Sequence, residues 1–382
     1  MKIRKAVITV LCCAAAFALF PFAMLANRST AYFAYKEITY KTMADRIACG
    51  SKAPERSAMR ISEYFHRYLF TPLGAQAVDK DTYNDIIRGI AYCDQRAWGM
   101  SAFLAKRDIN SRMVMTVNPD GMSNHTALEV FIDGGWRYFD PQYALIIRRK
   151  DGELASYSDI CKDPSLLVDS QRMQLLKKAC PFEYGTISKY LEKNVFNPGI
   201  IKPVVWSSPA RSRGRVARAI SGTLDIYVAF LGRKFSCLFQ DAYLGIYSGK
   251  GGHNTDYLLA RNYDIYGRFD KAVDYYRKFI GNSPLDAERY PAMLYLSIIY
   301  TNNGDYEAAI STLRAMMGES ASKKWSSTIY YWLGYNYEAR NDKEEAADCF
   351  RISIKEGTKT GDPSDMVKLL ELDSFERIAE SE

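Results

Sequence analysis

A cysteine, a histidine and an aspartate occur in the first half of the chain in the order that a thiol enzyme needs: Cys93, His125 and Asp140. In such enzymes an imidazole takes or balances the thiol proton, and a carboxylate fixes the tautomer of the imidazole. The chain has only 3 histidines, which limits the choice of imidazole. We interpret His66, which lies in a helical pattern, as structural, and His253, which follows two glycines, as a hinge. His125 is therefore the histidine that can serve chemistry.

The residues after Cys93 predict a helix that begins at or near the cysteine. Ala97, Met100 and Leu104 follow it at helical spacing. At a helix N-terminus the free backbone amides and the helix dipole favour a thiolate over a thiol. The predicted position of Cys93 is therefore one that prepares a thiol for nucleophilic attack.

A hairpin is predicted to bring His125 towards Asp140. Asp133-Gly134 separates two alternating runs, which is a strong signal for a two-residue turn. Such a turn pairs Ile132 with Gly135 and makes His125 the diagonal neighbour of Asp140 on one face. Diagonal neighbours lie about 7 Å apart at the backbone, within reach of a His–Asp hydrogen bond. The other face of the hairpin carries a set of core residues: Leu128, Val130, Ile132 and Phe139.

Between Gly89 and Tyr143 the chain carries a series of residues at characteristic spacing: Cys93, Ala97, Leu104, Ile109, Arg112, His125, Glu129, Val130, Asp133, Gly134, Trp136, Asp140 and Pro141. This series resembles the transglutaminase-like domain, a relative of the papain-like cysteine proteases, and a looser resemblance extends back to Ala44. The resemblance implies an α+β fold with Cys93 as nucleophile, His125 as base and Asp140 as the orienting residue. It also implies a cysteine peptidase, amidase or acyltransferase that works through a thioester.

A developing oxyanion is stabilised by hydrogen-bond donors, and the sequence identifies one of them. The backbone amide of Cys93 is the first donor. In contrast to the animal enzymes of this family, the chain has no tryptophan upstream of Cys93 to complete the oxyanion hole. Gln95 and Tyr64 are the candidates for the second donor.

Composition and cysteine usage narrow the class of protein. Hydrophobic residues make up 48% and charged residues 25% of the chain, the balance of a globular protein rather than a disordered one. The 8 cysteines form no C-x-x-C pair and show no zinc-site spacing, so we expect no metal and no cofactor. Outside the cytosol some of these cysteines could pair.

The C-terminal third of the chain repeats with a period of 37 residues. Gly267, Gly304 and Asn341 each open the same pattern, and the sixth position of each pattern is an alanine. A tyrosine precedes each pattern at one offset: Tyr263, Tyr300 and Tyr337. The pattern resembles the tetratricopeptide repeat, which implies an all-α solenoid that docks a protein partner. Because repeat units contact mainly their neighbours, we expect residues 253–382, with a last helix near 364–379, to fold without the rest.

The first residues predict how the chain meets a membrane. Lys2, Arg4 and Lys5 precede an uncharged run from Ala6 to Ala26, whose 21 residues are enough to span a bilayer as a helix. The basic residues predict a single-pass anchor with a cytoplasmic N-terminus and the bulk of the chain on the periplasmic or extracytoplasmic side. Secretion after cleavage of a signal peptide is the alternative.

Positive charge is concentrated between the two predicted domains. From Lys202 to Lys234 the chain has seven basic residues and one acidic residue, a difference of +6 out of the net charge of +7. The densest part of this patch consists of four arginines: Arg211, Arg213, Arg215 and Arg218. It suits an anionic lipid, an anionic glycan or an acidic partner, and a solvated linker is the alternative. We expect no nucleic acid partner outside the cytosol.

The sequence thus predicts four parts: an N-terminal anchor or signal helix (1–29), a transglutaminase-like domain (30–194), a basic connector (195–252) and TPR-like helical repeats (253–382). The predicted function is an envelope-associated thiol enzyme that performs acyl transfer or amide hydrolysis, with the repeats docking a protein partner or substrate. The alternative is a catalytically inactive scaffold that recruits an envelope complex.

Overall fold

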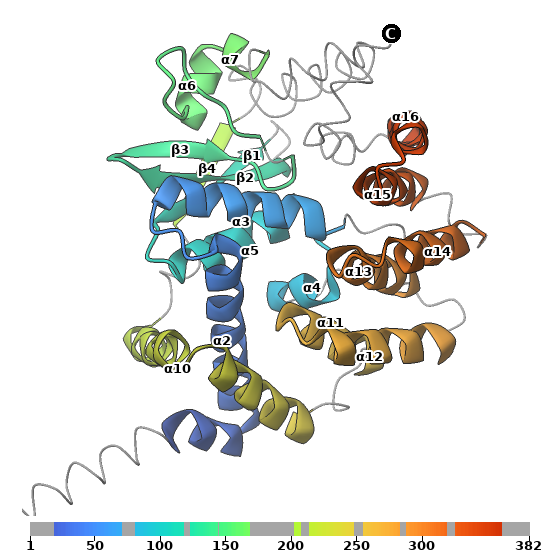
Figure 1. Cartoon of the computed structure of the whole chain (residues 1–382). Helices are drawn as coiled ribbons and strands as arrows, with labels where there is room; N and C mark the ends of the chain where they lie inside the picture. The colour runs from blue at the N-terminus through green and yellow to red at the C-terminus, as the bar shows by residue number, and fades with distance from the viewer. Residues whose placement is uncertain are drawn as a thin grey trace, which may run out of the picture.

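The computed structural model describes residues 19–70, 81–117, 123–143, 145–168, 202–207, 214–247, 255–282, 288–318 and 325–360, with backbone alone at 123–124, 202–207 and 357–360. These residues form a mixed α/β N-terminal region with a small antiparallel sheet, and a largely helical C-terminal region (Figure 1). The predicted N-terminal anchor lies mostly outside them. Among the helices described, none has both the length and the apolarity needed to cross a bilayer.

The N-terminal region begins with helices and continues into a sheet. Its elements are η1 (Met24–Ala26), α2 (Arg28–Ala48), α3 (Pro54–Tyr68), α4 (Thr82–Arg88), α5 (Cys93–Ala105), β1 (Ser111–Val117), β2 (Ser123–Ile132), β3 (Gly135–Phe139), α6 (Tyr157–Lys162), α7 (Ser165–Val168) and β4 (Lys202–Ser207). The sheet has the order β3-β2-β1-β4, and every neighbouring pair of strands is antiparallel. The helix α5 begins at Cys93, as the sequence predicted.

The predicted hairpin is confirmed, including its register. Ile132 pairs with Gly135 across the turn. Asp133 and Gly134 have φ angles of 48° and 77°, as a tight hairpin turn requires. The residues that we expected on the core face are all buried: Leu128, Val130, Ile132 and Phe139. The alternation of apolar and polar residues was sufficient to predict this element because one face of the sheet is covered by α5.

The segment treated as a connector is largely integrated into the N-terminal region. Its strand β4 pairs with β1 and so completes the sheet. Its long helix α10 (Arg215–Tyr247), which kinks at Gly232, packs along α2. The ammonium group of Lys106 joins these elements through ion pairs with Asp225 of α10 at 2.6 Å and Glu37 of α2 at 2.9 Å. Packing therefore crosses the boundary that the sequence suggested at residue 195.

The C-terminal region consists of helices that pair in chain order: α11 (Thr255–Ile265) with α12 (Phe269–Asn282), α13 (Arg289–Asn302) with α14 (Tyr306–Met317), and α15 (Ser326–Ala339) with α16 (Lys343–Thr360). Figure 1 shows the pairs stacked side by side along one flank of the sheet region. We call these six helices the array. The last predicted helix, near 364–379, lies outside the described residues.

The 37-residue period has a stereochemical cause in the turns within the helix pairs. Gly267, Gly304 and Asn341 have φ angles of 68°, 78° and 69°, the left-handed conformation that Gly and Asn adopt at helix ends. The amide of the next residue donates a hydrogen bond back to a tyrosine carbonyl in each case: Tyr263, Tyr300 and Tyr337. The alanine five residues after each turn is fully buried: Ala272, Ala309 and Ala346. Small side chains there let the paired helices approach closely.

The array is docked on the N-terminal region through buried polar contacts. Arg88 of α4 forms an ion pair with Glu288 at 2.8 Å, and both side chains are almost fully buried. The hydroxyl groups of Thr39 and Tyr266 are 2.9 Å apart, and both are also buried. A charge or hydroxyl that loses its partner in a buried place costs about 1–3 kcal/mol or more. Folding of residues 253–382 alone therefore stays a prediction, and these contacts oppose it.

Candidate active site

Three elements bring together the residues that the sequence placed in order. Cys93 is the first residue of α5, His125 lies in β2, and Asp140 directly follows β3. The His125 Nε2 atom is 2.7 Å from the Asp140 Oδ2 atom, and the Cys93 thiol is hydrogen-bonded to the His125 side chain. His125 is 1% exposed and Asp140 is 0% exposed, whereas Cys93 is half-buried. The imidazole therefore lies between a shielded carboxylate and a thiol that solvent can still reach.

The Asp140 carboxylate is held by four donors. The backbone amides of Gln142 and Tyr143 donate to its Oδ1 atom at 2.9 and 3.2 Å, because the chain turns sharply at Asp140-Pro141. Its Oδ2 atom accepts from the Tyr138 hydroxyl at 3.2 Å as well as from His125. The ring of Tyr143 also stacks on His125, with centroids 5.3 Å apart. These contacts leave the carboxylate and the imidazole little freedom to move apart.

The charge state of His125 follows from competing effects. Burial alone lowers the pKa of the imidazole, because it penalises the charged form. The Asp140 carboxylate, and then the Cys93 thiol, more than offset this effect and raise the pKa of His125 to about 10. The protonated imidazole is thus favoured near neutral pH. An imidazolium beside Cys93 is the partner that stabilises a thiolate.

The backbone that leads into Cys93 is fixed within the N-terminal region. The amide of Phe70 donates to the Gly89 carbonyl, and the amide of Ala91 donates to the Phe70 carbonyl, both at 2.9 Å. The buried guanidinium of Arg96 donates to the carbonyls of Ala91 and Leu69 at 3.1 and 2.9 Å. The start of α5 is therefore anchored by a short parallel bridge and by a buried cation.

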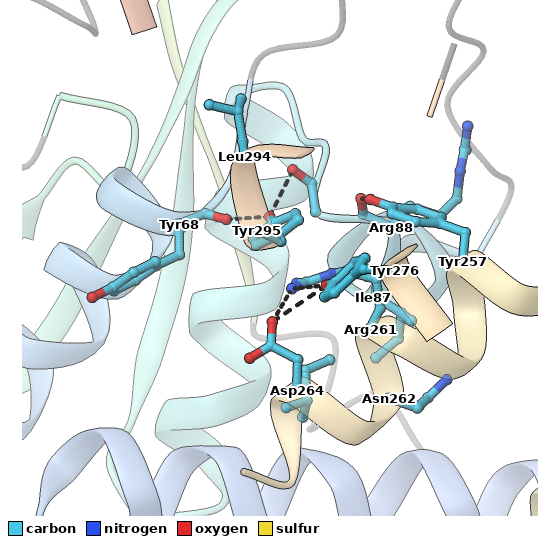
Figure 2. Close-up of polar contacts among 12 residues, drawn as sticks. Tyr68, Ile87, Arg88, Tyr257, Arg261, Asn262, Asp264, Tyr276, Leu294 and Tyr295 are labelled. Atoms are coloured by element: carbon cyan, nitrogen blue, oxygen red, sulfur yellow. Dashed lines mark hydrogen bonds and ion pairs between the residues drawn. The ribbon is translucent and has the colours of Figure 1, made fainter. Parts of the chain in front are cut away.

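The array holds the same backbone from the other side (Figure 2). Three array side chains donate hydrogen bonds to consecutive carbonyls of residues 87–89: Arg261 Nε to Ile87 at 2.7 Å, Tyr257 to Arg88, and Tyr295 to Gly89 at 3.2 Å. The Tyr295 hydroxyl also donates to the carbonyl of Tyr68. The array therefore contacts the chain four residues before the candidate nucleophile.

The positive charge of Arg261 is balanced by side chains of the array itself. The Arg261 guanidinium lies 3.4 Å from the ring centroid of Tyr295 and forms an ion pair with Asp264 at 2.8 Å. Burial raises the pKa of Tyr295 and Asp264 above their usual ranges. Arg261 is only 2% exposed. We call Arg261, Tyr295, Tyr276 and Asp264 the array clamp.

The two candidates for a second oxyanion donor differ in position. The Gln95 Oε1 atom accepts from the Tyr92 amide at 2.8 Å and its Nε2 atom donates to Asp94 at 3.3 Å, so this side chain caps α5 beside Cys93. Tyr64 instead packs against Phe103, with centroids 6.4 Å apart. Phe103 lies ten residues beyond Cys93, about 15 Å along the helix. The structure therefore brings Cys93, His125 and Asp140 together and leaves Tyr64 outside this group.

The other histidines and the arginine patch lie elsewhere. The His66 Nδ1 atom is 2.6 Å from the Gln142 carbonyl oxygen, in agreement with a structural role, and His253 lies outside the described residues. In the patch, Arg211 and Arg213 also lie outside the described residues. Arg215 and Arg218 are exposed on the first turn of α10. These two arginines therefore lie on a different element from Cys93, His125 and Asp140.

In the part of the chain that the structure describes, no group of three or more His, Cys, Asp or Glu side chains could hold a metal ion. Five cysteines in this part have free thiols: Cys49, Cys93, Cys161, Cys237 and Cys349. Burial raises the pKa of the Cys161 thiol, and it raises that of Cys349 to about 11. Near neutral pH these two thiols therefore stay protonated, which sets them apart chemically from a cysteine paired with a histidine.

Comparison with protein families matches residues 41–141 to the transglutaminase-like superfamily and residues 329–356 to the tetratricopeptide repeat. The chain contains a transglutaminase-like core domain. It also contains a tetratricopeptide repeat, formed by α15 and α16. No curated protein and no solved structure matches the chain. The matched core includes Cys93, His125 and Asp140, and it ends one residue after Asp140.

Sequence reasoning missed the residues that support the transglutaminase-like core from outside it. Tyr138 lies beside the core residue Phe139 in β3, and nothing in the alternation of the strand indicates that its hydroxyl contacts Asp140. Arg96 and Arg261 had one available signal, since each is a cation among residues expected on the buried face of a helix. Such a cation must find partners, and both arginines find backbone carbonyls. Which carbonyls they would meet could not be read from the chain.

Proposed function

We propose that the protein is an envelope-associated thiol enzyme that cleaves or transfers acyl groups through a thioester on Cys93. The observation that carries this proposal is the hydrogen-bonded series from Cys93 to His125 to Asp140 within the transglutaminase-like core. The half-buried thiol in contact with the imidazole supports an enzyme rather than an inactive scaffold. The uncharged run from Ala6 to Ala26, led by basic residues, supports the envelope location.

The proposed reaction begins when the Cys93 thiolate attacks the carbonyl carbon of an amide. The developing oxyanion forms beside the N-terminus of α5, where backbone amides have no partner within the helix. As the C–N bond breaks, the His125 imidazolium gives its proton to the leaving amine, and the acyl group remains on sulfur as a thioester. Water or an amine then attacks the thioester, His125 accepts its proton, and the Cys93 thiolate is released.

We further propose that the array recruits the protein partner or substrate on which this thiol acts. A tetratricopeptide repeat supports protein–protein interaction, and the 37-residue period extends its turn geometry over three helix pairs that form a short solenoid. The contact between the array and residues 87–89 supports this role, because a protein captured by the array would be held beside the segment that leads to Cys93. Recruitment and chemistry would then occur within one molecule.

Alkylation of the full-length protein with iodoacetamide, followed by mass spectrometry of each cysteine peptide, tests the proposed nucleophile. We expect Cys93 to be alkylated faster than the exposed Cys49 at pH 7, because an imidazolium in contact with the thiol favours the reactive thiolate. In the His125→Ala variant, the Cys93 rate should fall towards that of Cys49. A Cys93 rate that does not exceed the Cys49 rate, and does not change in this variant, would overturn the proposal.

A second experiment separates acyl transfer from hydrolysis. The protein is incubated with a mixture of peptides and a tagged primary amine, and the products are identified by mass spectrometry. An amide product that carries the tag shows transfer, whereas a new carboxylate shows hydrolysis. Cys93→Ala should remove either product and Cys49→Ala should remove neither. Products that persist in Cys93→Ala would exclude the thioester.

A further inference from the structure

The outer face of α10 carries most of the large apolar side chains that the described residues expose. Ten such residues are exposed, and six of them lie on this helix: Val216, Ile226, Phe230, Leu231, Leu238 and Ile246. Phe230 is 85% exposed. A contiguous exposed apolar surface is uncommon on a soluble monomer and indicates an interaction site.

Six exposed residues without charge before the kink share one face of the helix, and Leu231 lies off this face. They are Val216, Ala219, Gly222, Ile226, Ala229 and Phe230, which we call the apolar stripe. Steps of three or four residues from Val216 to Ile226, and from Ile226 to Ala229 and to Phe230, keep them on that face over about 21 Å. Basic residues flank the stripe at both ends, with Arg215 and Arg218 in the first turn and Arg233 and Lys234 just after Gly232.

The opposite face of α10 is fixed to the molecule, so the stripe cannot turn inward. Asp225 of this face is paired with Lys106, which is also paired with the fully buried Glu37. Leu224 and Tyr227 of the same face are buried. Rotation of the helix would break a buried ion pair and expose these residues, which costs several kcal/mol. The contacts of the opposite face therefore keep the stripe exposed in the folded protein.

The end of the N-terminal apolar run packs against buried residues of α10, on the side of the helix away from the stripe. The ring of Phe20 stacks on Tyr227 at 6.3 Å, and the ring of Phe22 packs against Phe235 and Phe239 at 6.3 and 6.0 Å. Leu19, at the first described position, is 65% exposed. The described end of the run, from Leu19 to Ala26, is therefore attached to the same helix that carries the stripe.

The flanking charges indicate what covers the stripe. If two copies paired through it with antiparallel helices, the basic ends of one would meet the basic ends of the other, which is unfavourable. Anionic lipid headgroups, in contrast, attract basic residues on both sides of an apolar helix face. Phe and Ile on that face suit the boundary between headgroups and acyl chains.

We propose that the apolar stripe lies in the interfacial layer of a bilayer, with Phe230 among the acyl chains and the flanking basic residues at anionic headgroups. This inference rests on the membrane location proposed above and adds a second contact to the N-terminal run. Figure 1 shows the stripe-bearing half of α10 beside α2, and Asp225 ties this half to Lys106 at the end of α5.

Photolabelling with a lipid-soluble aryl diazirine tests the inference on the full-length protein in vesicles of phosphatidylethanolamine and phosphatidylglycerol. Peptides that carry the label are then mapped by mass spectrometry. We expect label both in residues 6–26 and in residues 216–231. Label in residues 6–26 alone would overturn the inference and leave the membrane location intact. Label in neither segment would overturn both proposals.

Two matched variants sharpen the result. Phe230→Glu places a charge in the stripe and should reduce the label in residues 216–231 by at least about fivefold, because a carboxylate disfavours the apolar layer. Phe131→Glu makes the same change on β2, at a side chain that is 40% exposed, and should leave that label unchanged. If Phe230→Glu leaves the label unchanged, the stripe does not contact lipid. A different outcome would be that residues 216–231 carry no label in the wild-type protein and that Phe230→Glu dissociates an oligomer in detergent. A second copy of the chain would then cover the stripe.

Discussion

The triad of Cys93, His125 and Asp140 and the array clamp lie at the two ends of one short segment, from residue 87 to residue 93, and they differ in the kind of cation they contain. Both are buried and both contain an ion pair with a carboxylate. In the triad the cation is a histidine, which gains and loses a proton with a pKa raised to about 10. In the array clamp the cation is an arginine, which stays protonated in proteins.

The neighbours of the two cations differ in the same way. His125 contacts a half-buried thiol that can react, whereas Arg261 contacts tyrosines whose pKa values burial raises above their usual range. The tyrosines of the array clamp therefore stay protonated near neutral pH. Similar buried hydrogen bonding thus serves chemistry where the cation is a histidine beside a thiol, and serves positioning where the cation is an arginine among tyrosines.

The largest effect that this comparison predicts is on turnover, and it comes from Asp140→Asn. The amide retains the shape of the carboxylate but removes the negative charge that favours the His125 imidazolium. We expect turnover to fall by roughly 10²–10⁴, as in known triads, with little change in fold. The measurement is the rate of product formation beside a thermal melt. Unchanged turnover with a normal melt would remove Asp140 from the mechanism.

The pH dependence of stability should distinguish the triad from the array clamp. Because the folded-state pKa of His125 lies above its ordinary value of 6.5, its stabilisation is complete below pH 6.5 and is lost as pH rises through about 10. Urea denaturation between pH 6.5 and pH 9.5 should show a decrease on the order of a few kcal/mol. His125→Gln should flatten this dependence, and Tyr295→Phe, which removes a hydroxyl that stays protonated over this pH range, should leave its slope unchanged. The same slope in wild type and His125→Gln would contradict the assignment.

The sequence was sufficient where the physical rule is local. Asp133-Gly134 specifies a tight turn by its φ angles, and that turn alone fixes the register that brings His125 to Asp140. The left-handed turns at Gly267, Gly304 and Asn341 likewise follow from residue type. These features need only a few consecutive residues, so they could be predicted from the chain before any contact was known.

The sequence was insufficient where partners are distant and the rule is only that a buried group must be satisfied. Arg261 donates to the carbonyl of Ile87, which is 174 residues away, and any carbonyl would have served its charge equally well. Strand β4 gave no signal for its place beside β1, since the basic residues after it dominated the composition of that segment. Tyr64 was a candidate for the second oxyanion donor in the absence of an upstream tryptophan, and its ring instead packs near Phe103, towards the far end of α5.

Gly89→Ala tests whether the array clamp needs close approach to the backbone. Gly89 has a φ angle of 75°, and a methyl group there would overlap the ring and hydroxyl of Tyr295. Gly50→Ala is the matched control, because Gly50 has a φ angle of 70° and no atom within 4 Å of the added carbon. Both variants bear the same backbone strain, so their difference isolates the overlap with Tyr295. We expect Gly89→Ala to lose about 1–3 kcal/mol more than the control in urea denaturation.

This variant also bears on the thiol. If the clamp positions the segment that leads into α5, Gly89→Ala should slow the alkylation of Cys93, and Gly50→Ala should not. Equal losses of stability in the two variants would show that Tyr295 moves away from the added methyl group at no measurable cost in the free energy of unfolding. An unchanged Cys93 rate in a destabilised Gly89→Ala variant would show that the clamp holds the fold but not the nucleophile.

The smallest predicted effect belongs to a single hydroxyl group of the array clamp. In Tyr295→Phe the carbonyls of Tyr68 and Gly89 lose a donor, while the ring under Arg261 remains. Gly89 keeps the hydrogen bond from the Phe70 amide, so the loss is partial. We expect a cost of about 0.5–1.5 kcal/mol, the usual net value of one hydrogen bond. The measurement is the urea midpoint at pH 7.

Tyr337→Phe is the control for this change, because its hydroxyl accepts from Arg314 at 2.5 Å within the array and does not contact residues 87–89. The two variants should lose similar stability, since each gives up a partly buried hydrogen bond. Only Tyr295→Phe should also slow the alkylation of Cys93, because only its hydroxyl reaches the backbone that leads into α5. Equal Cys93 rates in the two variants would mean that the array is attached to the catalytic segment without positioning it, and recruitment would then be its sole remaining role.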